Sequence, residues 1–177
     1  MDKKSKIVRQ LCVNAVIAAA YAVLTIMLAP ISYGAVQCRV SEVLCVLPFL
    51  APTTVWGLFL GCVLANLFTG NLFDIIFGSL ATLLAALCTA WFGKRSQDMK
   101  NRILGCLMPV VFNAVIIGAV ITGAYEGLNI FKNFGVFALN GLWVGLGEAV
   151  VMFVLGLPAI SYIGKNRHLQ EQLEKIR

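Results

Sequence analysis

Five charged residues lie inside or at the edges of long apolar stretches of this 177-residue chain. A charge in such a place is expensive and tends to mark function. The charged residues are Arg39, Glu42, Asp74, Glu126 and Glu148, and the asparagines Asn66, Asn113 and Asn140 accompany them. Carboxylates accept hydrogen bonds and favour cations, and an amide both donates and accepts. With the flat ring of Trp143, the set predicts a pocket for a small planar heterocycle with N–H donors or a positive group.

The charged residues near the ends of the apolar stretches also have structural interpretations. Arg39 and Glu42 are close enough in sequence to pair with each other at the membrane interface. Asp74 lies at an expected helix start, where a carboxylate stabilises the N-terminal end. Glu126 fits a solvated loop. Binding and structural interpretations of these four residues therefore both stay open at the level of sequence.

Glu148 is the hardest of the set to explain structurally. It lies within Leu142–Leu157, far from either end of its apolar stretch, and no cation occurs in that stretch. The asparagines fit hydrogen bonds between helices, and Trp143 fits packing at an interface, as alternatives to binding. We therefore expect Glu148 to be the central residue of any pocket.

No pattern typical of an enzyme or a metal site accompanies these residues. The single histidine, His168, lies in the charged tail, and no His-Glu-x-x-His pattern or lysine-bearing glycine loop occurs. The six cysteines are scattered without a Cys-x-x-Cys pair. We expect no catalytic residue, no metal and no cofactor, and the lack of a nucleotide motif excludes a single-chain ATP-driven pump.

The composition of the chain indicates that these residues belong to a membrane protein. Hydrophobic residues make up 60% of the chain and charged residues 12%, which is roughly half the charged share of a soluble domain. Several apolar stretches reach about 20 residues, the length that crosses a bilayer as a helix. The sequence predicts one all-α integral membrane domain over residues 1–177.

Six transmembrane helices are expected, at about residues 8–29, 40–51, 54–68, 72–92, 103–124 and 134–163. The second and third come from one stretch, Val40–Phe68, which is too long for a single straight span and is interrupted near Pro52. With the N-terminus inside, all Lys and Arg residues except Arg39 and Lys132 fall on the inner side. This asymmetry predicts a cell-membrane protein with both termini cytoplasmic, and the polar residues gather in the outer half.

Small residues at four-residue spacing let helix backbones approach closely in lipid. The first apolar stretch carries two overlapping pairs, Ala15/Ala19 and Ala18/Ala22. These alanines serve either packing within the bundle or docking of a partner membrane protein, and the sequence alone does not decide between the two.

Three sequence blocks resemble the QueT family of queuosine-precursor transporters. They are ISYGAVQCRVSEVLCVLP at 31–48, GCVLANLF at 61–68 and DIIFGSLATLLA at 74–85, and a later Gly147-Glu148 pair also fits. The similarity extends over nearly the whole chain. Cys38 departs from it, standing where an apolar or aromatic residue is expected.

The resemblance implies more than the spacing does. Such proteins are similar to the substrate-binding (S) components of energy-coupling-factor (ECF) importers, which have a six-helix bundle. An S component binds its cargo outside and docks on a transmembrane coupling protein that carries two cytoplasmic ATPases. The implied cargo is a 7-deazaguanine, either 7-aminomethyl-7-deazaguanine or queuine. The alanine stripe matches the docking motif, and 31–39 would form part of an outer lid.

The resemblance also suggests roles for single residues. Glu148 would accept the N–H donors of the guanine edge, and Glu126 or Asp74 would take the aminomethyl cation. Two other functions remain open: an S component for another vitamin-like heterocycle, and a membrane assembly subunit whose polar residues only hold helices together. Neither nucleic-acid binding nor intramembrane catalysis is expected.

Overall fold

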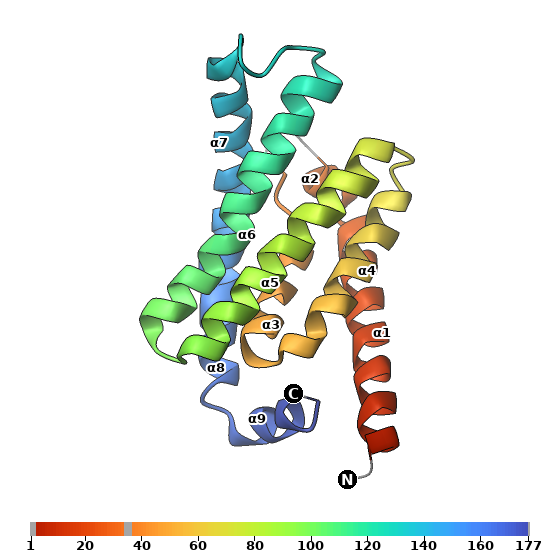
Figure 1. The fold of residues 1–177 in the computed structure, drawn as a ribbon, viewed down its shortest axis with the longest axis vertical. Helices are drawn as coiled ribbons and strands as arrows, with labels where there is room; N and C mark the ends of the chain where they lie inside the picture. Colours follow the sequence, from red (N-terminus) through yellow and green to blue (C-terminus); the bar gives the residue numbers. More distant parts are fainter. Residues whose placement is uncertain (1–2, 34–36, 177) are drawn as a thin grey trace.

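The computed structural model describes residues 3–33 and 37–176, and every regular element in these ranges is helical (Figure 1). The described residues include no β-strand. The all-α fold expected from hydropathy is therefore confirmed. Residues 34–36 of the expected outer lid, together with the two ends of the chain, lie outside the described residues.

Four helices are long and apolar enough to cross a membrane. Each of the last three contains a short π-helical stretch within a continuous helix. In chain order the elements of these four helices are α1 (Lys3–Met27), then η3 (Asp74–Gly78) with α5 (Ser79–Arg95), then α6 (Met99–Val120) with η4 (Ile121–Tyr125), and finally α7 (Phe134–Val150) with η5 (Val151–Gly156) and α8 (Leu157–Ile163). The chain is thus a membrane-embedded helical protein.

Two shorter apolar segments lie between α1 and η3. After α2 (Ala29–Ser32), the first consists of the 3₁₀-helix η1 (Val40–Val46) and α3 (Leu47–Leu50), and the second of η2 (Pro52–Thr54) and α4 (Val55–Leu67). Ala51 is extended, with φ −135° and ψ 93°, so the chain leaves helical geometry just before Pro52. Because 10–17 residues are few for a complete span, the count of six crossings stays a prediction.

The two termini lie at the same end of the bundle (Figure 1). The Ile176 carbonyl accepts hydrogen bonds from Gln10 Nε2 and Thr53 Oγ1, both at 2.8 Å, so the C-terminal segment is tied to the start of α1. The tail helix α9 (Arg167–Glu174) crosses beneath the bundle at this end. The turn between α5 and α6 also lies here, where Asp98 caps α6. The hydrogen bonds that Asp98 accepts from Asn101 hold the pKa of its carboxyl below the usual value.

Glycines permit the closest helix contacts in the bundle. A methyl group on Gly57 would meet Asn14, and one on Gly61 would meet Ala18 and Tyr21, so α4 lies directly against α1. Gly118 of α6 and Gly141 of α7 make the corresponding contact between those two helices. Small residues at a helix interface are the usual means of tight packing in lipid, where the hydrophobic effect does not bring helices together.

Gly93 shows how tight this packing becomes. Its Cβ position would lie 1.9 Å from the backbone oxygen of Phe49, which a side-chain rotation cannot relieve. We predict that Gly93→Ala destabilises the protein by about 1–3 kcal/mol, the usual cost of overpacking. Thermal unfolding of the purified protein in detergent measures this effect. The matched control is Gly135→Ala in α7, where nothing lies within 4 Å of the added carbon. Equal midpoints for the two variants would contradict the close approach.

Candidate functional site: a buried polar cluster

The segment η1 brings the first predicted site residues into the middle of the bundle. It packs against α1, α5, α6 and η5. Arg39, which precedes it, and Glu42, within it, are both buried. A charged side chain in such a place must be held by hydrogen bonds or serve a ligand.

Glu42 is held by hydrogen bonds on both oxygens. Oε1 accepts from the Tyr21 hydroxyl of α1 and, at 2.9 Å, from Thr82 Oγ1 of α5. Oε2 accepts from Cys45 Sγ at 2.8 Å. In the described part of the chain, no ion pair joins Glu42 to Arg39. The pairing of these two residues, one of the interpretations open from sequence, is therefore absent, and Glu42 is a structural centre that links α1, η1 and α5.

Three other buried residues, Arg39, Asn113 and Glu148, differ from Glu42 because they have polar atoms without a described hydrogen-bond partner. Their exposed fractions are 2%, 3% and 1%. Among the described residues, no partner is found for the three guanidinium nitrogens of Arg39, for either polar atom of Asn113, or for Glu148 Oε1. Each unpaired buried polar group costs about 1–3 kcal/mol, and more when it is charged. Such a set is costly for stability alone, and it is typical of a binding site.

These three residues come from the start of η1, from α6 and from α7. Glu148 lies near the end of α7, and η5, which continues this helix from Val151, packs against η1. The Arg39 guanidinium lies 5.5 Å from the centre of the Tyr33 ring, and its Nη1 is 3.8 Å from the Cβ position of Gly78. Arg39 thus reaches from η1 toward the π-helical start of α5. Short π-helical stretches within α-helices often occur at functional sites.

Asn66 contacts Gly78, the residue that Arg39 also approaches, and it bonds to Asp74. Asn66 Nδ2 donates to the Asp74 carbonyl at 2.9 Å and to Ser79 Oγ at 3.4 Å, so it does join helices, as the structural interpretation allows. Asp74 makes no capping hydrogen bond. Asn71 accepts from the Phe73 backbone N–H at 2.9 Å at the start of this helix instead. The buried Asp74 side chain therefore remains a candidate for binding.

Three of the predicted residues lie away from this cluster. Asn140 Nδ2 donates to Thr122 Oγ1 at 3.0 Å and to Glu126 Oε1 at 3.1 Å, which joins α7 to the end of η4. Glu126 is exposed, as a solvated loop residue would be. Trp143 is 46% exposed, with Leu142 and Leu146 also exposed beside it. The structure therefore separates Asn140, Glu126 and Trp143 from the buried residues.

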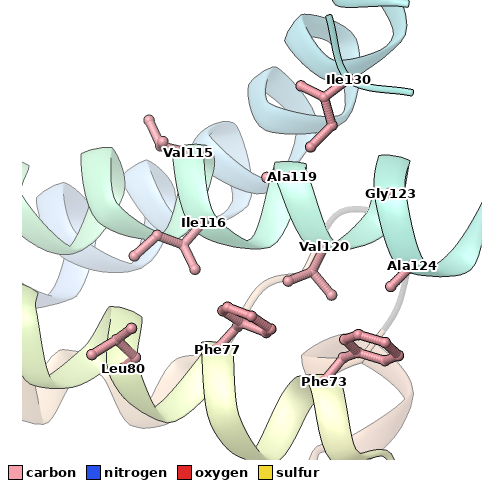
Figure 2. Close-up of a pocket in the computed structure, with 10 residues that line it drawn as sticks. All are labelled: Phe73, Phe77, Leu80, Val115, Ile116, Ala119, Val120, Gly123, Ala124 and Ile130. Carbon is pink, nitrogen blue, oxygen red and sulfur yellow. The ribbon is translucent and has the colours of Figure 1, made fainter. Parts of the chain in front are cut away.

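A groove of about 570 Å³ lies between η3–α5 and α6–η4 (Figure 2). Phe73, Phe77 and Leu80 form one wall, and the other lining residues are Val115, Ile116, Ala119, Val120, Gly123, Ala124 and Ile130. None of the predicted site residues is among the ten that line this groove. An apolar lining cannot pair the N–H and C=O groups of a heterocycle, so the buried polar cluster is the better candidate for a polar ligand.

Comparison with known proteins identifies the family. A sequence model described as "QueT transporter" matches residues 11–165. The chain belongs to the QueT transporter family. The resemblance found in the sequence is thereby confirmed, and membership of a transporter family agrees with the expectation of a protein that is not an enzyme.

One curated relative is the "Queuosine precursor transporter QueT" of Lactococcus lactis subsp. cremoris (strain MG1363). It is 37% identical over 83 residues, which are 46% of this chain and 48% of the relative. The match thus spans about half the length of the curated relative. No solved structure gives a significant match to this QueT-family chain.

The alanine stripe of this QueT-family member is divided by the fold. Ala18 and Ala22 are buried, and Ala18 contacts Gly61 of α4. Ala15 and Ala19 are exposed on the other side of α1. The first pair is used for packing inside the bundle, and only the second pair is available to a partner.

Sequence reasoning missed the residues that hold the QueT-family cluster in place. Tyr21, Thr82 and Cys45 bind Glu42, and Thr25 Oγ1 lies 2.6 Å from Ser41 Oγ, which joins α1 to η1 a second time. A phenol within a run of alanines, at Tyr21, was the available signal. Hydroxyl and thiol groups in apolar helices are otherwise too common to indicate a site.

The Tyr21 hydroxyl should contribute substantially to stability. Tyr21→Phe removes one donor from a buried carboxylate, which should destabilise the protein by about 1–3 kcal/mol. Chemical or thermal unfolding in detergent measures the difference. Tyr162→Phe is the matched control, because Tyr162 is 66% exposed and surface changes usually stay within about 0.5 kcal/mol. A Tyr21→Phe protein as stable as this control would show that Glu42 is not held as described.

Proposed function

We propose that this chain is the substrate-binding S component of an ECF-type importer and takes up a queuosine precursor from outside the cell. The cargo is 7-aminomethyl-7-deazaguanine or queuine. The observation that carries the proposal is the group of buried, unpartnered side chains of Arg39, Asn113 and Glu148. Membership of the QueT transporter family and the name of the Lactococcus relative support the choice of cargo.

The chemistry of the cluster suits a guanine-like ring. Six donor and acceptor atoms of Arg39, Asn113 and Glu148 have no partner among the described residues, and a flat heterocycle with a carbonyl and adjacent N–H groups offers the complementary atoms. Asp74 is buried about one helical turn before Gly78, whose Cβ position lies 3.8 Å from Arg39 Nη1, and it is the candidate for the aminomethyl cation. Glu126 is exposed and bonded to Asn140, which makes it the weaker candidate for that group.

We further propose six membrane crossings with both termini in the cytoplasm. The four long helices supply four crossings, and the short segments η1–α3 and η2–α4 supply two more as a pair on either side of Ala51. The termini and the turn between α5 and α6 lie at one end of the bundle (Figure 1). These segments carry most of the cations of the chain, and cations favour the cytoplasmic side.

The proposed importer needs partner subunits that hydrolyse ATP to drive transport. An ECF coupling protein in the membrane would dock on the exposed face of α1, and two cytoplasmic ATPase subunits would drive release. Ala15 and Ala19 are exposed on that face, and the apolar side chains of Leu11, Val16 and Val23 are exposed around them. Small residues between larger apolar ones allow a partner helix to approach closely.

Native mass spectrometry of the purified protein with its co-purified ligand tests the cargo directly. Recovery of a 7-deazaguanine is the expected result. Recovery of a different vitamin-like heterocycle would overturn the choice of cargo. If saturating 7-deazaguanine also gives no binding, the chain has the role of a membrane assembly subunit.

Glu148→Gln should weaken binding of 7-aminomethyl-7-deazaguanine by at least about 10-fold, measured by calorimetry. The neutral amide places a donor where the ring N–H groups need an acceptor, and a mismatched buried hydrogen bond costs about 1–3 kcal/mol. Glu171→Gln in the exposed tail helix serves as the control for removal of a carboxylate. Unchanged affinity in Glu148→Gln would remove Glu148 from the site.

Docking is tested separately from binding. Ala15→Trp and Ala19→Trp should each abolish uptake by cells but leave ligand affinity within about 3-fold of the original, because a bulky ring prevents close helix approach. Val115→Trp is the matched control, since Val115 is exposed on α6. Normal uptake by both alanine variants would show that this face is in contact only with lipid.

A further inference from the structure

We infer that Asn113 reads the five-membered-ring edge of the cargo, so that the protein takes up the free base and rejects a base substituted at N9. This inference rests on the proposed function and adds the chemical form of the cargo. It follows from the order in which three buried side chains present donors and acceptors.

The three side chains differ in what they offer. A guanidinium only donates, an ionised carboxylate only accepts, and a carboxamide does both side by side. In these three side chains, the atoms without a partner among the described residues are all three guanidinium nitrogens of Arg39, Oε1 of Glu148, and both Oδ1 and Nδ2 of Asn113. A ligand that satisfies them must present an acceptor to Arg39, donors to Glu148, and an acceptor next to a donor to Asn113.

The packing of α6 against α7 brings Asn113 and Glu148 to neighbouring levels. The Cβ position of Gly145 lies 3.2 Å from Ala114 Cβ and 3.9 Å from Val110 Cγ1. Asn113 precedes Ala114, and Glu148 follows Gly145 by about one helical turn, so the two lie at neighbouring levels of this helix pair. In addition, η5, which begins at Val151, packs against η1, whose first residue follows Arg39 directly. On this basis we place Glu148 between Arg39 and Asn113.

The edge of a 7-deazaguanine has the same order of groups. The carbonyl O6 accepts, N1–H and the 2-amino group donate, and N3 accepts next to the donor N9–H. Arg39 then pairs with O6, Glu148 with N1–H and the 2-amino group, and Asn113 with N3 through Nδ2 and with N9–H through Oδ1. A two-point amide contact of this kind is the same arrangement by which asparagine reads adenine in DNA.

The free N9–H is the specific requirement of this arrangement. Any substituent at N9, a ribose included, removes the donor and leaves Asn113 Oδ1 buried without a partner. Asn113 is 3% exposed, so water cannot easily compensate. A site built to pair with a ligand group discriminates strongly against an analogue that lacks it.

Calorimetry with two ligands and two proteins tests the inference. The ligands are 7-aminomethyl-7-deazaguanine and its 9-methyl derivative, which differ by the N9 substituent alone. The unaltered protein should bind the 9-methyl compound about 10-fold to 100-fold more weakly. In Asn113→Leu the parent base should lose a similar factor, and the two ligands should then bind within about 3-fold of each other. The pattern is a double-mutant cycle between Asn113 and N9–H.

Controls separate this inference from the proposed function. Val111→Ala changes an exposed residue of the same helix and should leave both affinities and their ratio unchanged. Equal binding of the two ligands by the unaltered protein, or a preference that persists in Asn113→Leu, would overturn the role of Asn113 and leave the proposed function standing. Failure of the parent base to bind the unaltered protein would overturn both.

Discussion

The hydrogen bonds to Glu42 are the interaction on which the rest of the structure depends. A carboxylate inside an apolar bundle is tolerated only when its oxygens are paired. Tyr21, Thr82 and Cys45 provide that pairing from α1, α5 and η1 itself. Because these partners come from helices far apart in the sequence, the position of η1 is fixed from two sides, and with it the position of Arg39.

Within the buried polar cluster, side chains whose polar atoms are hydrogen-bonded hold the structure together, and side chains whose polar atoms lack a described partner are the candidates for binding. Both oxygens of Glu42 and the Nδ2 of Asn66 are paired with other residues, whereas Asn66 Oδ1 and several atoms of Arg39, Asn113 and Glu148 have no described partner. The hydrogen bonds of Glu42 limit the cost of burying its charge, and they hold η1, and with it Arg39, in place. A side chain that is already held in place loses little conformational entropy when a ligand binds, and this favours selective binding.

Hydropathy predicted the helical membrane fold, the four long helices and the interruption at Pro52, because apolar length and proline act locally. It also singled out Glu148 as the carboxylate with no local reason to be buried. The pairing of Glu42 with Tyr21 instead of Arg39 was not predictable, since it depends on which helices become neighbours. The division of the alanine stripe was hidden for a related reason: the pairs Ala15/Ala19 and Ala18/Ala22 differ only in rotation about α1, and the sequence does not fix that rotation.

The 3₁₀ winding of η1 has a consequence for the depth of the site. With three residues per turn, Glu42 and Cys45 stand directly above one another, which is the geometry of their hydrogen bond. Rewound as an α-helix, the same seven residues would shorten by about 3.5 Å and turn Cys45 away from Glu42 by about 60°. The pitch of this one segment therefore sets how far Arg39, which precedes η1, stands from α3, which follows it. Arg39 is buried, and inside the protein the surroundings are less polarisable than water, so each charge acts on its neighbours more strongly than it would in water.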